Sequence, residues 1–393
     1  LKLKPDLLDV RKRREEAYAK LMPGEKVDRV EMNLKSIAEE PMIKGMEQLK
    51  MGNFNKAIEF FIHVTELDPG FDVSWDYIGF AYLRLGQYQK ALEALKKAVL
   101  INPKNDEAWN NLGSAYNELG QYQKALEAFE KAVLINPNSD VIWVNMGSAY
   151  NELGQYQKAL EVLKKGILIN PKNEVAWGDI GLIYIRFDQY QKALEALEKA
   201  IQLNPNNKVT WNNMGFAYSC IGKYKEAIEN YSKAIQIDSN YGLALANRGD
   251  ALIGLGGHAE AKKYFEQAIR AGEREAGYWG LGLIFYCKGD FKQAVDYFVR
   301  GSQADHQELA SHLQKAYEFE RKGKSAEAMQ EIKKADGLLV AFLESGYLPI
   351  TKQWGKLTRL SHPSSGLPHA TSKTVVFVIN SGVNPKGVSG KVV

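Results

Sequence analysis

The sequence predicts an all-α protein of the solenoid class, built from stacked helix–turn–helix units. Three observations support this. A tryptophan recurs every 34 residues, at Trp75, Trp109, Trp143, Trp177 and Trp211. Glycine, tyrosine, alanine and proline keep the same 34-residue register. Each repeat also holds two apolar runs with helical spacing, and a unit of this size cannot bury both apolar faces alone. Neighbouring units must therefore stack to complete the core.

Residues 106–139 show the pattern of one unit, with Asp106 as position 1. Its first apolar run places Trp109, Leu112, Gly113 and Tyr116 on one face of a helix. The small Gly113 allows a second helix to approach, and Gly120 is expected to end the first helix. A second run from Tyr122 to Val133 follows, and Asn136-Pro137 ends it because proline disfavours a helical residue before it.

The recurring pattern W-x2-L-G-x2-Y, followed by alanine, phenylalanine, alanine and proline, resembles the tetratricopeptide repeat, whose period is also 34 residues. The resemblance implies a right-handed superhelix lined by the first helix of every unit. It also implies that the repeated tryptophan, tyrosine and alanine are packing residues that carry no chemistry.

The register divides the chain into four parts. Residues 1–37 are expected to form a charged helical arm, and residues 38–308 a solenoid of about seven units. Residues 309–343 keep only part of the pattern, which indicates a degenerate capping pair of helices. Residues 344–393 form a basic tail containing proline, glycine and serine, and it has no Asp or Glu from Ser345 onward.

Composition narrows the classes of function. A net charge of +4 is too small to indicate a nucleic-acid partner. No apolar run approaches the roughly 18 residues that a membrane span requires. The two cysteines, Cys220 and Cys287, form no metal-ligand pattern and fit reduced thiols in a cytoplasmic protein. The chain begins at Leu1, so a targeting signal can precede it. No catalytic motif, metal site or cofactor site is expected.

The candidate binding surface is the inner face, which we define as positions 2, 5, 6, 9, 12 and 13 of each first helix. Stacking does not need these positions. Position 6 carries a row of amides with one acid, Asn111, Asn145, Asp179, Asn213 and Asn247. An amide both donates and accepts, so the row can bind the backbone of an extended peptide. It resembles the asparagine ladder in the repeats of O-linked N-acetylglucosamine transferases, from which Asp179 departs. The alternative is that asparagine is simply common at this polar position.

The rest of the inner face changes character along the chain. Its first half is polar and includes Asn110, Asn117 and Asn151, whereas its second half is apolar and includes Leu182, Ile185 and Phe216. The apolar residues are candidate contacts for a ligand. Alternatively, they pack against the tail or the next turn of the superhelix. Tetratricopeptide domains that bind chaperones hold a C-terminal carboxylate with lysine at position 5 and asparagine at position 9. This sequence has no lysine at position 5 and no asparagine at position 9, so the resemblance does not imply chaperone binding.

The sequence therefore predicts a non-enzymatic scaffold that binds an extended protein or peptide segment in a concave groove. Two alternatives stay open. The chain could be the substrate-recruiting region of a larger glycosyltransferase-like enzyme whose catalytic domain is absent. It could also be a structural scaffold that assembles with copies of itself.

Overall fold

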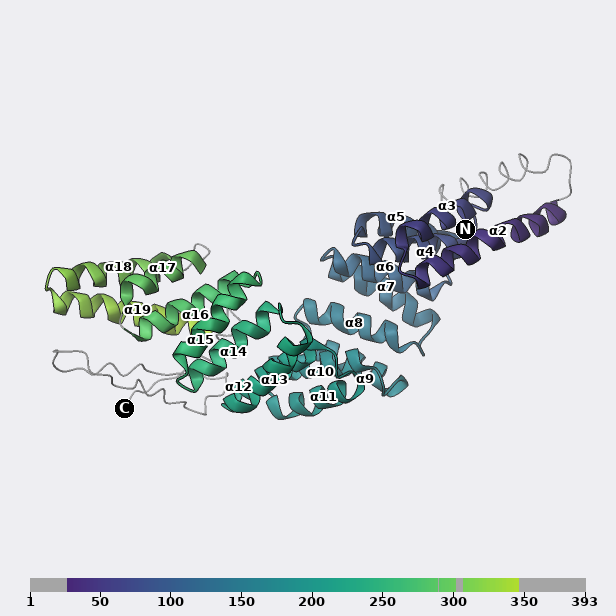
Figure 1. Ribbon diagram of the computed structural model, residues 1–393. Helices are drawn as coiled ribbons and strands as arrows, with labels where there is room; N and C mark the ends of the chain where they lie inside the picture. Colours follow the sequence, from purple (N-terminus) through teal and green to yellow (C-terminus); the bar gives the residue numbers. More distant parts are fainter. Residues whose placement is uncertain (1–26, 289, 302–306, 346–393) are drawn as a thin grey trace. The chain divides into compact units, whose positions relative to one another are not determined.

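The computed structural model describes residues 27–288, 290–301 and 307–345. Within these ranges the protein contains 18 α-helices and no strand (Figure 1). The chain divides into two compact units, one ending at Arg186 and one beginning at Phe187, and each is described by itself. The prediction of an all-α solenoid is confirmed.

Successive helices alternate between the first and second helix of a repeat. The unit that ends at Arg186 contains α2 (Val27–Lys50), α3 (Phe54–Leu67), α4 (Asp72–Arg84), α5 (Tyr88–Ile101), α6 (Asp106–Glu118), α7 (Tyr122–Ile135), α8 (Asp140–Glu152), α9 (Tyr156–Ile169) and α10 (Glu174–Arg186). The unit that begins at Phe187 contains α11 (Tyr190–Leu203), α12 (Lys208–Cys220), α13 (Tyr224–Ile237), α14 (Gly242–Gly254), α15 (His258–Arg270), α16 (Arg274–Cys287), α17 (Phe291–Gly301), α18 (Gln307–Arg321) and α19 (Ser325–Ser345).

The turn inside each repeat requires a left-handed backbone. Gly120 ends the first helix of its repeat with φ 69°, as the sequence predicts. Asp188 occupies the equivalent position after α10 and adopts φ 56°. Aspartate tolerates this region better than most residues with a Cβ atom, so the turn is kept where glycine is missing.

The two helices of a repeat approach each other at a glycine. A Cβ atom added to Gly113 in α6 would lie 2.5 Å from the Phe129 ring of α7. The same contact recurs between Gly147 and Leu163, at 2.6 Å. Phe129 and Leu163 are almost fully buried. The large side chain of the second helix therefore fills the space that the glycine leaves, and the repeat has no room for even a methyl group there.

Neighbouring repeats are joined by polar contacts as well as apolar packing. The indole Nε1 of Trp109 donates to the carbonyl oxygen of Pro103, which closes the preceding repeat, over 3.0 Å. The same bond is made by four other tryptophans, Trp75, Trp143, Trp177 and Trp211. The sequence predicted only a packing role for the tryptophan. Its indole N–H also fixes the loop that precedes its own helix.

The ends of the repeat array show two further features. α2 continues across residues 37 and 38, where the sequence placed the end of the arm, and contains Pro41 without a break. The segment 309–343, expected to form a capping pair, falls on α18 and α19, which pack against each other. Most of the expected arm and nearly all of the expected basic tail lie outside the described residues.

We expect Gly113→Ala to lower the free energy of unfolding by about 1–3 kcal/mol, because its methyl group would overlap the buried Phe129 ring. Gly337→Ala is the matched control, since Gly337 lies in α19 with no atom within 4 Å of an added Cβ. There alanine should be neutral or stabilise by up to about 1 kcal/mol. Urea unfolding followed by circular dichroism measures both. Equal shifts of the two midpoints would contradict this account of the helix contact.

Candidate functional site

The first helices lie on the inner side of the stack in each compact unit. α6 packs directly against α4 and α8, and α14 packs against α12 and α16. The second helices of neighbouring repeats make no comparable contact among the described residues. A stack whose first helices are closer together than its second helices curves toward the first helices. The helices that carry the predicted inner face are therefore the ones that lie closest together between neighbouring repeats.

Three ladder residues donate hydrogen bonds to side chains of the preceding repeat. Asn111 Nδ2 donates to Asp76 Oδ1 over 2.8 Å, and Asn145 Nδ2 donates to Asn110 Oδ1 over 2.9 Å. In the second compact unit, Asn247 Nδ2 donates to Asn212 Oδ1 over 2.9 Å. Each bond joins position 6 of one repeat to position 5 of the repeat before it. The ladder is thus partly a structural connection between neighbouring first helices.

This pairing explains why Asp179 departs from the ladder. The preceding repeat has Val144 at position 5, which offers no acceptor, so an amide donor at residue 179 would lack that partner. Asp179 instead accepts a hydrogen bond from the Ser148 hydroxyl, with 3.2 Å between Oγ and Oδ2. The repeat before Asn213 has Gly178 at position 5, and Asn213 makes no side-chain hydrogen bond within the described part of the chain.

The paired amides keep groups that a ligand can use. A hydrogen bond between two amides uses one N–H and one carbonyl lone pair, so each pair retains further donors and acceptors. Asn110, Asn111, Asn145 and Asn213 are half-buried and can present them. Asn247 is different, because it is only 4% exposed and its partner Asn212 only 3%. Asn247, which the sequence placed in the candidate binding surface, is therefore buried between repeats.

The other predicted site residues fall into three groups. Asn117 and Asn151 are half-buried, and the Oδ1 atom of each is buried without a donor among the described residues. Leu182 and Phe216 are half-buried on α10 and α12. Ile185 is buried, with 6% exposure, so it does not present an open apolar surface.

Two aspartates on the inner face have pKa values that are raised above the ordinary value. Burial raises the pKa of Asp76 to about 6, although the hydrogen bond from Asn111 opposes that shift. Burial likewise raises the pKa of Asp179 to about 6 against the hydrogen bond from Ser148. Both carboxylates are therefore held in surroundings that disfavour their charge.

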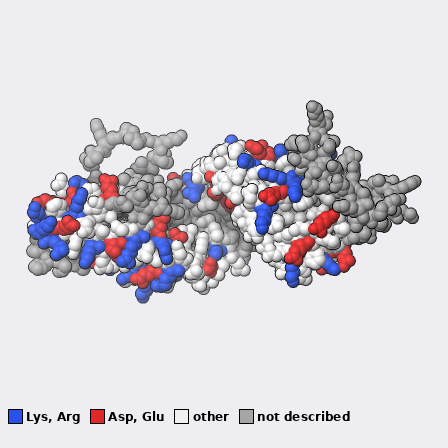
Figure 2. Space-filling view, turned by 90° about the horizontal axis from the view of Figure 1, so that it is seen from above, with Lys and Arg blue, Asp and Glu red and all other residues white. Residues whose placement is uncertain are grey.

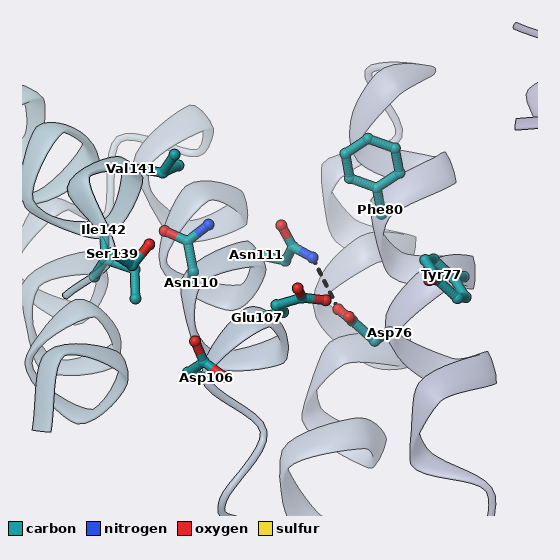
Figure 3. Close-up of a pocket in the computed structure, with 10 residues that line it drawn as sticks. All are labelled: Asp76, Tyr77, Phe80, Asp106, Glu107, Asn110, Asn111, Ser139, Val141 and Ile142. Carbon is teal, nitrogen blue, oxygen red and sulfur yellow. Dashed lines mark hydrogen bonds between the residues drawn. The ribbon is translucent and has the colours of Figure 1, made fainter. Parts of the chain in front are cut away.

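A pocket of about 320 Å³ opens on the inner face of α4, α6 and α8 (Figure 3). Its lining combines aromatic, acidic and amide side chains with apolar residues of the next repeat, namely Asp76, Tyr77, Phe80, Asp106, Glu107, Asn110, Asn111, Ser139, Val141 and Ile142. Figure 3 shows the carboxylates of Asp76 and Glu107 turned toward each other. The sequence predicted Asn110 and Asn111 as site residues but did not predict this pocket, because three repeats contribute to it.

Metal-binding clusters, membrane-spanning helices and charged surfaces are the other features that could indicate a function in the described part of the chain. No three His, Cys, Asp or Glu residues there are grouped so as to hold a metal ion. None of the described helices is long and apolar enough to cross a membrane. On the face seen in Figure 2, basic and acidic side chains are interspersed without a broad field of one sign. The expected absence of a nucleic-acid partner stays a prediction.

Comparison with known families agrees with this architecture. The family model of the cilia and flagella-associated protein 70 C-terminal domain matches residues 110–341, more than half of the chain. The chain belongs to this family. Models of the tetratricopeptide repeat also match residues 78–140 and 42–71. The prediction of a tetratricopeptide-repeat protein is confirmed. Among curated protein sequences there is no significant match.

Several solved structures are similar to parts of the chain. MamA is 30% identical, and the match covers 42% of this chain and 96% of MamA with a TM-score of 0.38. A tetratricopeptide repeat protein from Parabacteroides merdae ATCC 43184 is 21% identical, with coverage of 66% and 98% and a TM-score of 0.49. YrrB, described as a repeat protein with an unusual peptide-binding site, is 21% identical, with coverage of 47% and 95% and a TM-score of 0.38.

We expect Asp179→Asn to stabilise the protein at pH 7 by about 1–2 kcal/mol, because removing the disfavoured charge outweighs an amide N–H that finds no acceptor at Val144. The folded pKa of Asp179, about 6, lies above its ordinary 3.8, so the folded state holds more protons between these values. Wild-type stability therefore falls as pH rises through this window, and asparagine removes that loss. The midpoints of urea unfolding at pH 4 and pH 7 test this prediction. The control is Glu127→Gln, which changes an exposed acid. An equal gain at both pH values would refute the explanation.

We expect Asn247→Ala to destabilise the protein by about 1–3 kcal/mol, because it leaves the buried Asn212 Oδ1 without its donor. Asn213→Ala is the matched control, since it removes an amide of the same ladder that makes no such bond. Its effect should stay within about 0.5 kcal/mol. Thermal unfolding compares the two variants. A loss from Asn213→Ala as large as that from Asn247→Ala would count against a structural role for the pairing.

Proposed function

We propose that the chain is a non-enzymatic interaction scaffold that binds an extended segment of another protein along the inner face of its first helices. The observation that carries this proposal is the row of half-buried amides at positions 5 and 6. These amides are fixed by bonds between repeats, yet Asn110, Asn111 and Asn145 retain spare donors and acceptors. Such groups match the N–H and C=O groups of an extended backbone whatever its side chains.

Apolar side chains beside the amides supply a second type of contact. Val141, Val175 and Val209 occupy position 2 in three successive repeats and are between 46% and 51% exposed. Leu182 on α10 and Phe216 on α12 are half-buried at position 9 of the first helix, each within its own compact unit. A segment that bonds to the amides with its backbone would place alternate side chains against these apolar residues. The amides would then provide affinity, and the apolar positions would provide selectivity.

The test is affinity capture from a lysate of the source organism with the full chain, comparing wild type with Leu182→Asp/Phe216→Asp. A charged group at an apolar contact should reduce recovery of a specific partner by about tenfold or more. The matched control is Leu134→Asp/Leu168→Asp, which changes two leucines that are 85% and 84% exposed on the second helices α7 and α9. Circular dichroism confirms folding of each variant. Retention of the partner by the inner-face variant, or equal loss in the control, would refute the proposal.

A further inference from the structure

The pocket between α4, α6 and α8 has a charge that the rest of its repeats do not share. These three first helices carry seven acidic residues and a single cation, Arg84. The second helices α5, α7 and α9 carry eight lysines. Three of those lysines lie over indole rings, Lys97 over Trp75, Lys131 over Trp109 and Lys165 over Trp143. These second helices also carry four glutamates, so their net charge is positive, whereas the net charge of the three first helices is negative.

Within the pocket, Asp76 is the central acid. Its side chain is only 3% exposed, and Oδ1 accepts the hydrogen bond from Asn111. Asn111 is the only hydrogen-bond donor to this carboxylate among the described residues, which leaves its second oxygen available to a ligand. Glu107 faces it across the pocket (Figure 3). No ion pair within the described ranges neutralises either acid. Two carboxylates held together without a cation form an arrangement that a positively charged ligand would stabilise.

Aromatic rings complete the same pocket. Tyr77 and Phe80 lie one turn apart on α4, and the Tyr77 ring is stacked on the buried Phe61 with 5.2 Å between ring centroids. Guanidinium groups bind well to this combination, because they can stack on an aromatic face and donate two parallel hydrogen bonds to carboxylates. The volume of about 320 Å³ is near the lower limit of ligand pockets, which suits a side chain better than a large cofactor.

We propose that this pocket binds an arginine side chain of the extended protein segment that occupies the inner face. The inference rests on the proposed function and specifies the chemistry of the partner at one place. Asp76 and Glu107 receive the guanidinium, and Tyr77 or Phe80 stacks on its plane. Asn110 and Asn111, which also line the pocket, fix the backbone on either side of the arginine.

The test measures binding of the full chain to a fluorescein-labelled peptide of alternating glycine and arginine by fluorescence anisotropy. Peptides with lysine or glutamate in place of arginine are the comparison probes. Asp76→Asn/Glu107→Gln should weaken arginine-peptide binding by about fivefold. Asparagine at residue 76 can still accept the hydrogen bond from Asn111, so the pairing between repeats is kept. The matched control is Glu93→Gln/Glu127→Gln, which changes net charge equally on the exposed side of α5 and α7.

Tighter binding of the arginine peptide than of the lysine peptide, lost only in the pocket variant, supports the proposal. Equal loss in both variants would show unspecific attraction and overturn it, as would equal binding of the glutamate peptide. A full-length variant with Lys352, Lys356, Arg359 and Lys373 changed to glutamine tests whether this chain's own tail occupies the pocket. Binding about fivefold tighter in that variant would overturn the assignment to a partner protein. If these results fail while Leu182→Asp/Phe216→Asp still loses its captured partner, only the arginine inference fails.

Discussion

The contact between a glycine of the first helix and a large side chain of the second is the constraint on which the rest of this structure depends. Where Gly113 meets Phe129, the helices are too close for another side chain at that point. That distance fixes the thickness of a repeat and hence how neighbouring repeats meet. The tryptophan then bonds the proline carbonyl of the preceding repeat, as Trp109 does to Pro103, and sets the register between them. Packing residues thus hold the first helices of each compact unit in a row.

The amides of the inner face bond to neighbouring repeats and still keep unused donors and acceptors. The bond from Asn145 to Asn110 satisfies part of each amide and orients both. The unused donors and acceptors are therefore presented in fixed directions, which lowers the entropy lost when a ligand binds. Where position 5 lacks an acceptor, the face changes, as at Val144 and Asp179. The sequence of the inner face is thus constrained by neighbouring repeats.

Because ladder amides bond to neighbouring repeats, some of them contribute to stability as well as to the candidate binding surface. Replacing Asn247 removes a buried hydrogen bond as well as a candidate ligand contact, so lost binding would not identify a site. Residues without a structural bond, such as Asn213, and apolar residues such as Leu182 separate the two effects better. The acidic pocket offers a third route, because asparagine at residue 76 preserves the bond to Asn111 while removing the charge.

The sequence alone determined the all-α solenoid of tetratricopeptide repeats, because a strict 34-residue period records the same packing several times. It also identified Asn111 and Asn145 as a row. Only the tertiary structure showed that these amides bind position 5 of the preceding repeat, that Asn247 and Ile185 are buried, and that Asp76, Glu107 and Phe80 share a pocket. The physical reason is that periodicity describes each helix by itself. Contacts across repeats depend on which side chains of separate helices meet, and a single repeat does not contain that information.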